Sequence, residues 1–500
     1  MKNSPLKTYL AEVSAEKINT AFVSYIANLE QVAQVGPEIA ASIVKELEAQ
    51  RTHLKLIASE NYCSLNTQAA MGNLLTDKYA EGFPSHRYYG GCENIDDIES
   101  VAAEEAKALF GAEHAYVQPH SGADANLVAY WAILSAKIEA PVLEKLNETN
   151  LANLTDEQWA DLRVSLGNQK LLGLDYYSGG HLTHGYRQNV SARMFDAHSY
   201  TVSKETGLLD YDAIEKQAME IKPLILLTGY SAYPRAINFR RFREIADKCG
   251  AVLMVDMAHF AGLVAGKVFT GDEDPVKWAD VVTTTTHKTL RGPRGAIVLC
   301  KAAFTDYVNK GCPLVLGGPL PHVMAAKAIA FKEARTPAYQ DYAKSVRDNA
   351  RILAAELQNL GMTIQTGGTD NHLMLINVTQ FGLTGRQAET AMSECGMTLN
   401  RNSLPFDPNG AWWTSGLRIG TPAITTLGMG PAEMKEIARI IKLVLFASKP
   451  GKTDKGVASK GRVVVDEDAK TEAIAAVNAL LGKFVLYPEL DLEFLKKSFC

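Results

Sequence analysis

The sequence predicts an α/β protein in which a large, mainly parallel sheet with helices on both faces is followed by a smaller α/β domain. Three observations predict this fold. The chain of 500 residues is 47% hydrophobic and 21% charged, an ordinary globular composition, and its length favours two or three domains because single cores stop growing near ~250 to 300 residues. Short apolar runs alternate with helical patterns through the centre of the chain. After Gly317 the pattern changes to long helices and shorter alternations.

The central strands are predicted from continuous apolar runs: LILLTGY (224–230), AVLMVD (251–256), DVVTTTT (280–286) and GAIVLC (295–300), with a helix over 239–249. Such runs separated by helices are typical of a parallel sheet buried on both faces. Ligands of these sheets bind beyond the carboxyl ends of the strands. Polar residues follow the first three runs, which predicts a site at that edge; they are Ser231, Tyr233, Asp256, His259, His287 and Lys288.

The whole chain divides into four predicted regions: an N-terminal helical arm (1–54), a large domain (55–325), a small α/β domain (326–448), and a linker with a helical tail (449–500). In the arm, apolar residues at helical spacing predict two amphipathic helices between Ala15 and Gln50, broken at Gly36 and Pro37; they are Ile18, Phe22, Ile26, Leu29, Ile39, Ile43 and Leu47.

Two further segments are predicted to be additions to the fold. Residues 140–174 form a charged, helical insertion that directly precedes the stretch GGHLTHG (179–185). Residues 449–462 are rich in Gly and Lys but contain no aromatic residue, so we expect a solvated tether and not a nucleic-acid-binding patch. The tail over 467–498 is predicted to be helical.

Composition argues against several classes of protein. The net charge of −5 gives no support for nucleic-acid binding, and the absence of a signal peptide or a long apolar run predicts a cytoplasmic protein without membrane contact. The seven cysteines are scattered and never form CxxC, so we expect reduced thiols and neither a disulfide framework nor a zinc site. There is no GxGxxG, Walker loop or HExxH, and His181 and His184 lack a set of further ligands, so no metal is predicted.

Lys288, in TTTTHKTLRGPRG, is the most suggestive single residue. Burial at the end of a strand, with Arg291 and Arg294 nearby, would lower its pKa toward Schiff-base chemistry, although a lysine in this position is more often a solvated loop residue. Asp256 ends the preceding strand, where a carboxylate can keep a pyridine nitrogen protonated or can simply cap a helix.

Two other motifs would complete a site for a phosphorylated pyridine cofactor. HSGADAN (120–126) opens a helical pattern with a Ser-Gly turn, and a helix N-terminus binds a phosphate dianion readily. Arg418, in TSGLRIGTPA, could hold a carboxylate through two hydrogen bonds. In isolation the first is an ordinary helix cap and the second a surface arginine.

Together, blocks of sequence across residues 50–445 resemble the serine hydroxymethyltransferase family in their order: LIASENY (56–62), TDKYAEGFPSHRYYGG (76–91), QPHSGADAN (118–126), GGHLTHG (179–185), VDMAHFAGLVA (255–265), VVTTTTHKTLRGPRG (281–295), GGPLPH (317–322), GGTDNHL (367–373) and TSGLRIGTPAIT (416–426). The resemblance implies an aspartate-aminotransferase-like fold, pyridoxal-phosphate fold type I, with a seven-stranded sheet.

The same resemblance implies the roles of particular residues. The catalytic residues would be Lys288, Glu81, His259, Tyr89 and His287, with Lys288 holding pyridoxal phosphate and Glu81 transferring protons. The cofactor would also contact Asp256, His259, His181, Ser121, Gly122, Ala123 and Ser231, and Tyr79 and Gly318 would reach it from a neighbouring subunit. The substrate would contact Ser59, Tyr89, Glu81 and Arg418. The folate would contact Tyr176, Gly180, His181, Leu182, Gly410, Ala411 and Trp412.

The implied reaction moves the hydroxymethyl group of serine to tetrahydrofolate and leaves glycine, in a homodimer or tetramer with shared sites. Three features depart from the family pattern: Ala123 replaces a serine of the usual Ser-Gly-Ser motif, Phe406 stands where a polar residue is usual, and the insertion precedes a folate-side segment. They motivate an alternative, a folate-independent aldolase or alanine racemase. A third hypothesis is that the protein is a scaffold without catalytic activity. The joint presence of Lys288, Asp256, Glu81 and Arg418 argues against it.

Overall fold

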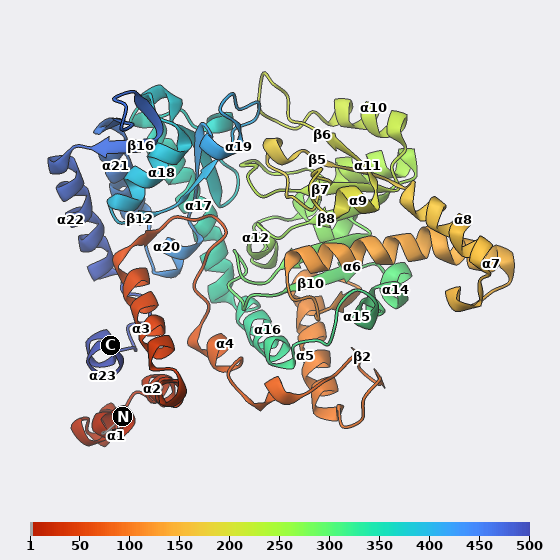
Figure 1. Ribbon diagram of the computed structural model, residues 1–500, viewed down its shortest axis with the longest axis horizontal. Helices are drawn as coiled ribbons and strands as arrows, with labels where there is room; N and C mark the ends of the chain where they lie inside the picture. The colour runs from red at the N-terminus through yellow and green to blue at the C-terminus, as the bar shows by residue number, and fades with distance from the viewer. Residues whose placement is uncertain (1–3) are drawn as a thin grey trace.

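The computed structural model describes residues 4–500 and is built around a seven-stranded sheet (Figure 1). The order of its strands is β4 (His114–Tyr116), β10 (Ala296–Cys300), β9 (Val281–Thr285), β8 (Val252–Asp256), β7 (Ile225–Gly229), β5 (Lys170–Leu174) and β6 (Asp196–Tyr200). Only β10 is antiparallel to its neighbours in this sheet, because the connection from β9 contains no crossover helix. The predicted mainly parallel α/β fold is confirmed.

The sheet is buried on both faces, as the apolar runs predicted. Every residue of β7, β8, β9 and β10 is buried. Residues alternate between two cores along each strand: Leu226 of β7 packs in one, and Ile225 and Leu227 pack in the other. The helix predicted over 239–249 is α11 (Phe239–Cys249), and α10 (Tyr211–Ile221) packs beside it (Figure 1).

The insertion predicted over 140–174 is too long at its C-terminal end. Residues 170–174 are β5, which pairs with β6 and β7 inside the sheet. The additional structure is the helix pair α7 (Ala140–Leu146) and α8 (Asp156–Gly167), which extends outward beyond α6 (Gly122–Leu134) in Figure 1. The run LLGL was the missed signal, because it is a short buried strand next to a charged segment.

A second core surrounds a three-stranded antiparallel sheet of β11 (Leu373–Asn377), β14 (Gly416–Gly420) and β13 (Asn400–Asn402). Its helices are α18 (Gly385–Glu394), α21 (Pro431–Phe446), α22 (Glu467–Lys483) and part of α17 (Pro337–Asn359).

The chain passes from the first core to the second at a later residue than the predicted domain boundary at 325/326. That position falls inside α16 (Pro321–Ala334), whose apolar residues pack in the first core. The change occurs along α17, where Val346 belongs to the first core and Ala350 to the second.

The segment 449–462 is not a solvated tether. It lies within an antiparallel hairpin of β15 (Ser448–Lys452) and β16 (Ala458–Val465), which packs on α18. Composition predicted solvation because the Lys side chains are polar, whereas the backbone pairs in a ladder that composition does not reveal. The helical tail is confirmed as α22 and α23 (Leu492–Phe499).

The N-terminal arm contains α1 (Pro5–Glu12), α2 (Thr20–Val35) and α3 (Pro37–Thr52), which pack with α23 (Figure 1). The break at Gly36 and Pro37 is confirmed. The buried face of α3 differs from the prediction: Ala40, Val44 and Leu47 are buried, while Ile39 and Ile43 are 55% and 38% exposed. The arm joins the second core through β1 (Leu54–Lys55), which pairs with β12 (Met397–Thr398).

The other α-helices and strands within residues 4–500 range from single turns to the 18-residue helix α5. They are α4 (Leu65–Ala69), β2 (Gly82–Phe83), β3 (His86–Arg87), α5 (Glu93–Phe110), α9 (Ser191–Met194), α12 (Ala261–Ala265), α13 (Pro275–Trp278), α14 (Thr305–Asn309), α15 (Gly311–Leu314), α19 (Gly410–Trp413) and α20 (Pro422–Thr426). Within residues 4–500, no helix combines the length and apolar character that crossing a membrane requires.

Candidate active site

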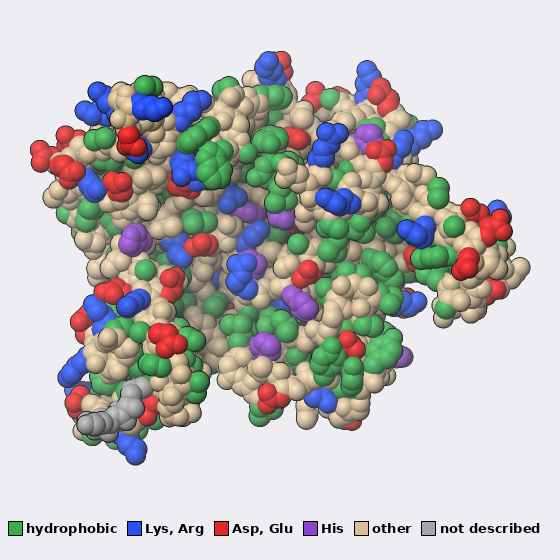
Figure 2. Space-filling model, viewed as in Figure 1, with side chains coloured by type: hydrophobic (Ala, Val, Ile, Leu, Met, Phe, Trp, Pro, Cys, Tyr) green, Lys and Arg blue, Asp and Glu red, His purple; other side chains and the backbone are tan. Residues whose placement is uncertain are grey.

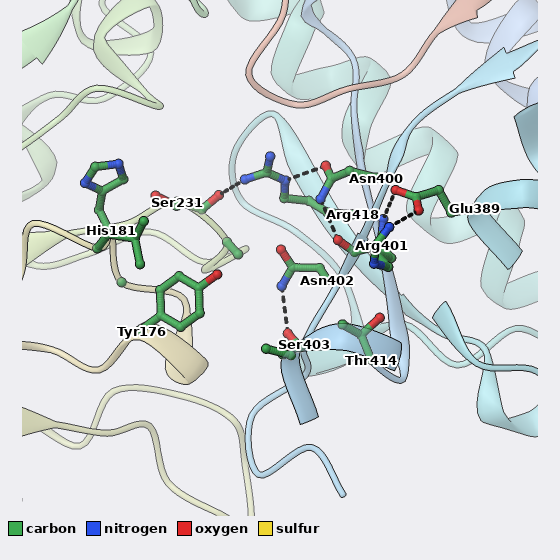
Figure 3. Close-up of a pocket in the computed structure, with 14 residues that line it drawn as sticks. Tyr176, His181, Ser231, Glu389, Asn400, Arg401, Asn402, Ser403, Thr414 and Arg418 are labelled. Atoms are coloured by element: carbon green, nitrogen blue, oxygen red, sulfur yellow. Dashed lines mark hydrogen bonds and ion pairs between the residues drawn. The ribbon is translucent and has the colours of Figure 1, made fainter. Parts of the chain in front are cut away.

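A pocket of about 470 Å³ opens between the sheet and the second core, where the carboxyl ends of the parallel strands meet (Figure 3). Tyr176, His181 and Ser231 line it from loops that follow β5 and β7, and Arg401 and Arg418 line it from β13 and β14. On this face of the molecule, His, Lys and Arg side chains gather in the hollow at the middle (Figure 2). The arrangement agrees with the rule that such sheets bind ligands at this edge.

Asp256, the last residue of β8, is 7% exposed and ionised. Its Oδ2 accepts hydrogen bonds from Asn126 Nδ2 at 2.9 Å and His184 Nε2 at 3.2 Å, and its Oδ1 accepts one from the backbone N–H of Ala258 at 3.0 Å. Burial alone would raise the pKa of Asp256, but His184 and Asn126 outweigh it and hold this pKa well below its ordinary value. A fixed anion therefore lies at the end of β8.

Lys288 lies just beyond β9, the strand that pairs with β8. Its side chain is half-buried, and its backbone carbonyl accepts a hydrogen bond from Asn61 Nδ2 at 3.0 Å. Burial, with Arg418 and Arg294 adding to it, lowers the pKa of Lys288 to about 8 against the opposing charge of Asp256. A much larger share of this amine is therefore neutral at pH 7 than for an exposed lysine.

Four histidines near the lysine and the carboxylate, His181, His259, His287 and His372, are neutral at pH 7. Burial is the main cause that lowers the pKa of His181 to about 4 and those of His287 and His372 to about 3, and burial also holds that of His259 well below its ordinary value. The Nδ1 of His259 lies 3.3 Å from Nε2 of His372. Because these rings are neutral, they do not compete with a cationic group of a ligand for the negative charge of Asp256.

The Ser-Gly turn caps a helix at the same edge. Ser121 is the N-cap of α6, and its hydroxyl accepts a hydrogen bond from the backbone N–H of Asp124 at 3.2 Å. A Cβ on Gly122 would lie 2.8 Å from Cγ2 of Thr285, so no larger residue fits without movement. Ala123, which lacks the hydroxyl of the usual motif, is exposed. The N-terminus of α6 therefore offers backbone N–H groups to an anion.

Arg418 is aimed across the pocket by two hydrogen bonds. Its Nη1 donates to the backbone carbonyl of Ser231 at 2.6 Å, and its Nε donates to Asn400 Oδ1 at 3.1 Å (Figure 3). Burial lowers its pKa to about 10, so the guanidinium stays charged. Ser59 follows Ala58, which packs directly against Gly420 at the end of the same strand, β14.

Comparison with known proteins agrees with this geometry. The family model described as serine hydroxymethyltransferase matches residues 32–146 and 162–441. The chain belongs to the serine hydroxymethyltransferase family. A serine hydroxymethyltransferase of Treponema pallidum is 67% identical over 499 residues, which cover 100% of this chain and 87% of that protein. Relatives of the same name from Salinispora tropica and Chlamydia muridarum are 55% and 51% identical, over 95% and 98% of this chain and 99% of each relative.

The residues of this family member that were assigned to a neighbouring subunit or to proton transfer form a second, separate group. Tyr79 Oη donates to Glu81 Oε1 at 3.2 Å, the ring centroids of Tyr79 and Tyr89 are 5.0 Å apart, and Gly318 adjoins the ring of Tyr79. Tyr79 and Tyr89 are 53% and 46% exposed. This group flanks β2, which lies well away from α19 in Figure 1, and no hydrogen bond within residues 4–500 joins it to Lys288, Asp256 or Arg418.

The predicted folate-side residues are divided by the structure. Five of them line the pocket: Tyr176, Gly180, His181, Leu182 and Ala411. Gly410 and Trp412 do not; Trp412 lies outside, with the guanidinium of Arg386 5.0 Å from its ring centroid. Phe406 is 52% exposed, has a positive φ of 59° and is also absent from the pocket lining.

Three buried residues that hold the site were not assigned to it from the sequence. Asn126 bridges Asp256 and Thr183, because its Nδ2 donates to both Asp256 Oδ2 and Thr183 Oγ1. The sequence suggests His184 only as a candidate metal ligand, and it predicts no role for His372, which lies in the family-like stretch GGTDNHL (367–373). Asn126 lies one helical turn beyond the Ser-Gly turn, and that spacing on a buried face could have identified it.

The side chains of His181, His184 and Asp256 lie close enough to ligate a metal ion together. Each already has a partner nearby: His181 Nδ1 lies 2.7 Å from Thr183 Oγ1, and His184 pairs with Asp256. A metal would have to displace these hydrogen bonds.

Proposed function

We propose that this protein transfers the hydroxymethyl group of serine to tetrahydrofolate, giving glycine and 5,10-methylenetetrahydrofolate, with pyridoxal phosphate bound to Lys288. One observation carries the proposal: a lysine of lowered pKa and a buried, ionised carboxylate stand at the ends of the paired strands β9 and β8. The printed names of its relatives support the same reaction.

The residues present fit this cofactor. Gly122 leaves a cradle that a Cβ would fill, and the N-terminus of α6 with Ser121 suits the phosphate. Asp256 suits a protonated ring nitrogen because it is anionic and held in place, and His181 offers a neutral ring beside it. When bound, pyridoxal phosphate supplies an electron sink for the bond that breaks at the α-carbon.

We assign the amino-acid carboxylate to Arg418. Its hydrogen bonds to Ser231 and Asn400 use Nη1 and Nε and fix the plane of the guanidinium, so its remaining N–H groups can donate to a carboxylate. We assign the pterin to the wall formed by Tyr176, Leu182 and Ala411. Neither Phe406 nor the α7–α8 insertion lines this pocket, which removes two reasons for the folate-independent alternative.

We further propose that two copies of the chain share each site. In one chain Glu81 lies with Tyr79 and Tyr89 on an exposed surface, apart from Lys288, so a second copy is needed to supply the carboxylate that holds and returns a proton. We also propose a cytoplasmic location, which the seven free cysteines support.

The reaction is tested with serine labelled at its hydroxymethyl carbon. We expect label in the folate product and one glycine per transfer, with a rate that depends on tetrahydrofolate. Glycine formed at the same rate without tetrahydrofolate would support a folate-independent aldolase instead.

The shared site is tested by co-expressing Lys288→Ala with Glu81→Gln. Each variant alone is expected to be inactive. A mixed dimer contains one site with both native residues, so random pairing should restore about a quarter of the wild-type activity. No restoration in verified mixed dimers would place both residues in a single-chain site.

A further inference from the structure

The C-terminal hairpin of β15 and β16 lies outside the part of the chain that the family model matches, which ends at residue 441. It nevertheless packs on α18, a helix of the second core that also carries Glu389 in the pocket lining. The hairpin and the pocket therefore contact the same helix.

Gln387 ties the hairpin to the start of α18. Its Nε2 donates to the backbone carbonyls of Ser459 at 2.6 Å and Arg462 at 2.8 Å, while its Oε1 accepts from the backbone N–H of Thr384 at 2.8 Å and caps the helix. The hydroxyl of Thr384 donates to the carbonyl of Lys460 at 2.7 Å. Gln387 is only 1% exposed, so losing its amide would remove the donor that two carbonyls of the hairpin share.

Between these anchors, Gly461 lets the hairpin pack closely against Trp413, the last residue of α19. A Cβ on Gly461 would lie 3.2 Å from Cζ3 of Trp413 and 3.6 Å from Nε of Arg386. The guanidinium of Arg386 lies 5.0 Å from the ring centroid of Trp412 and 5.7 Å from that of Trp413. This cluster holds α19 between α18 and the hairpin.

The same helix α18 holds the pocket side of α19. The backbone N–H of Gly385 donates to the carbonyl of Thr414 at 2.9 Å, and Glu389 pairs with Arg401 (Figure 3). Thr414, Glu389 and Arg401 line the pocket together with Ala411 of α19. A displacement of the hairpin would therefore move the wall opposite Tyr176.

We propose that the hairpin of residues 448–465 braces the folate side of the pocket, and that Gln387 and Gly461 are positioning residues for the one-carbon acceptor. The inference rests on the proposed function. In this proposal the hairpin affects the affinity for tetrahydrofolate but not the chemistry at Lys288. It does so without touching either substrate.

The test is Gly461→Val, with Gly482→Val as the matched control because a Cβ on Gly482 meets nothing within 4 Å. We expect Gly461→Val to raise the KM for tetrahydrofolate about tenfold, as a shift of the wall by a fraction of an ångström would. The KM for serine and the rate of folate-independent cleavage of a 3-hydroxy amino acid should stay within about twofold, since binding at Arg418 is untouched. Trp413→Leu in the same chain should recover part of the tetrahydrofolate affinity by making room for valine.

Gln387→Met provides a second variant of similar volume. It should raise the KM for tetrahydrofolate in the same selective way and speed amide hydrogen exchange over residues 408–416. An unchanged KM for tetrahydrofolate would overturn the proposal that the hairpin braces the pocket. An equal loss of rate in the folate-independent reaction would also overturn it. A wild-type protein that does not use tetrahydrofolate would instead overturn the proposed function, so the two failures are distinct.

Discussion

The two groups of predicted catalytic residues differ in how their surroundings hold them. Around Lys288, Asp256 and His259 are buried at 7% and 2% exposure, and hydrogen bonds connect the strands, α6 and the second core. Around Glu81, Tyr79 and Tyr89 are about half exposed, and within residues 4–500 Tyr79 Oη donates its hydrogen bond to Glu81 alone. The first group is preorganised within one chain. The second group lies on the surface, and its side chains would become buried only if another molecule packed against them.

The largest expected effect is on the buried side. Asp256→Asn keeps the shape of the side chain but removes the anion, so the activity should fall about a thousandfold, equivalent to about 4 kcal/mol of transition-state stabilisation. The visible absorption band of bound cofactor should also weaken at low cofactor concentration.

Glu81→Gln is the matched change on the exposed side, where the activity should fall while the cofactor band and the thermal midpoint stay unchanged. If Asp256→Asn kept more than a tenth of the activity, the contrast between the two groups would be wrong.

The next largest effect should be on the free energy of unfolding, which depends on the hydrogen bonds of the buried group. Asn126→Leu removes the amide that donates to both the buried Asp256 and Thr183, and we expect a loss of about 3 kcal/mol in the free energy of unfolding. Urea titration of the apoprotein measures it, which keeps cofactor affinity out of the comparison. A loss below about 1 kcal/mol would show that water replaces the missing hydrogen bonds.

A smaller effect concerns pH. The neutral amine of Lys288 is the form that attacks an aldehyde, and its pKa is lowered to about 8. Below pH 8 the rate at which the apoprotein binds pyridoxal phosphate covalently should rise about tenfold per pH unit, and it should level off above pH 8. Stopped-flow absorbance between pH 6 and 10 follows the rate. A rise that continues to pH 10 would contradict the influence of burial and of Arg418.

The smallest effect is expected for Tyr79→Phe, which removes one exposed hydrogen bond to Glu81. The free energy of unfolding of the monomer should change by less than about 0.5 kcal/mol. Denaturation at several protein concentrations measures it, because a stabilising contact with a second copy would add a concentration-dependent part.

Much of this arrangement could be predicted from the sequence because it depends on local patterns. The strands that end at Asp256 and before Lys288 are continuous apolar runs, and Arg418 stands among small residues in a strand. β5 was missed because a charged segment precedes it, and the hairpin of β15 and β16 was missed because its stability comes from a ladder and from Gln387, which is distant in sequence.

The absence of a hydrogen bond between Glu81 and Lys288 within residues 4–500 could not be predicted from single residues. It depends on where β2 lies relative to the large sheet, which is a property of the whole fold. Asn126 illustrates the intermediate case: its spacing from Ser121 was available, but its partner Thr183 is far away in sequence.

Helix α17 restricts how the two halves of the molecule can move. Tyr339, Ala343 and Val346 pack in the first core, Ala350, Leu353 and Leu357 pack in the second, and Asn349 between them is bonded to Thr425 and to the carbonyl of Met429. Because this continuous helix packs in both cores, we expect the second core to move relative to the first by a small rotation about α17 and not by a wide hinge opening.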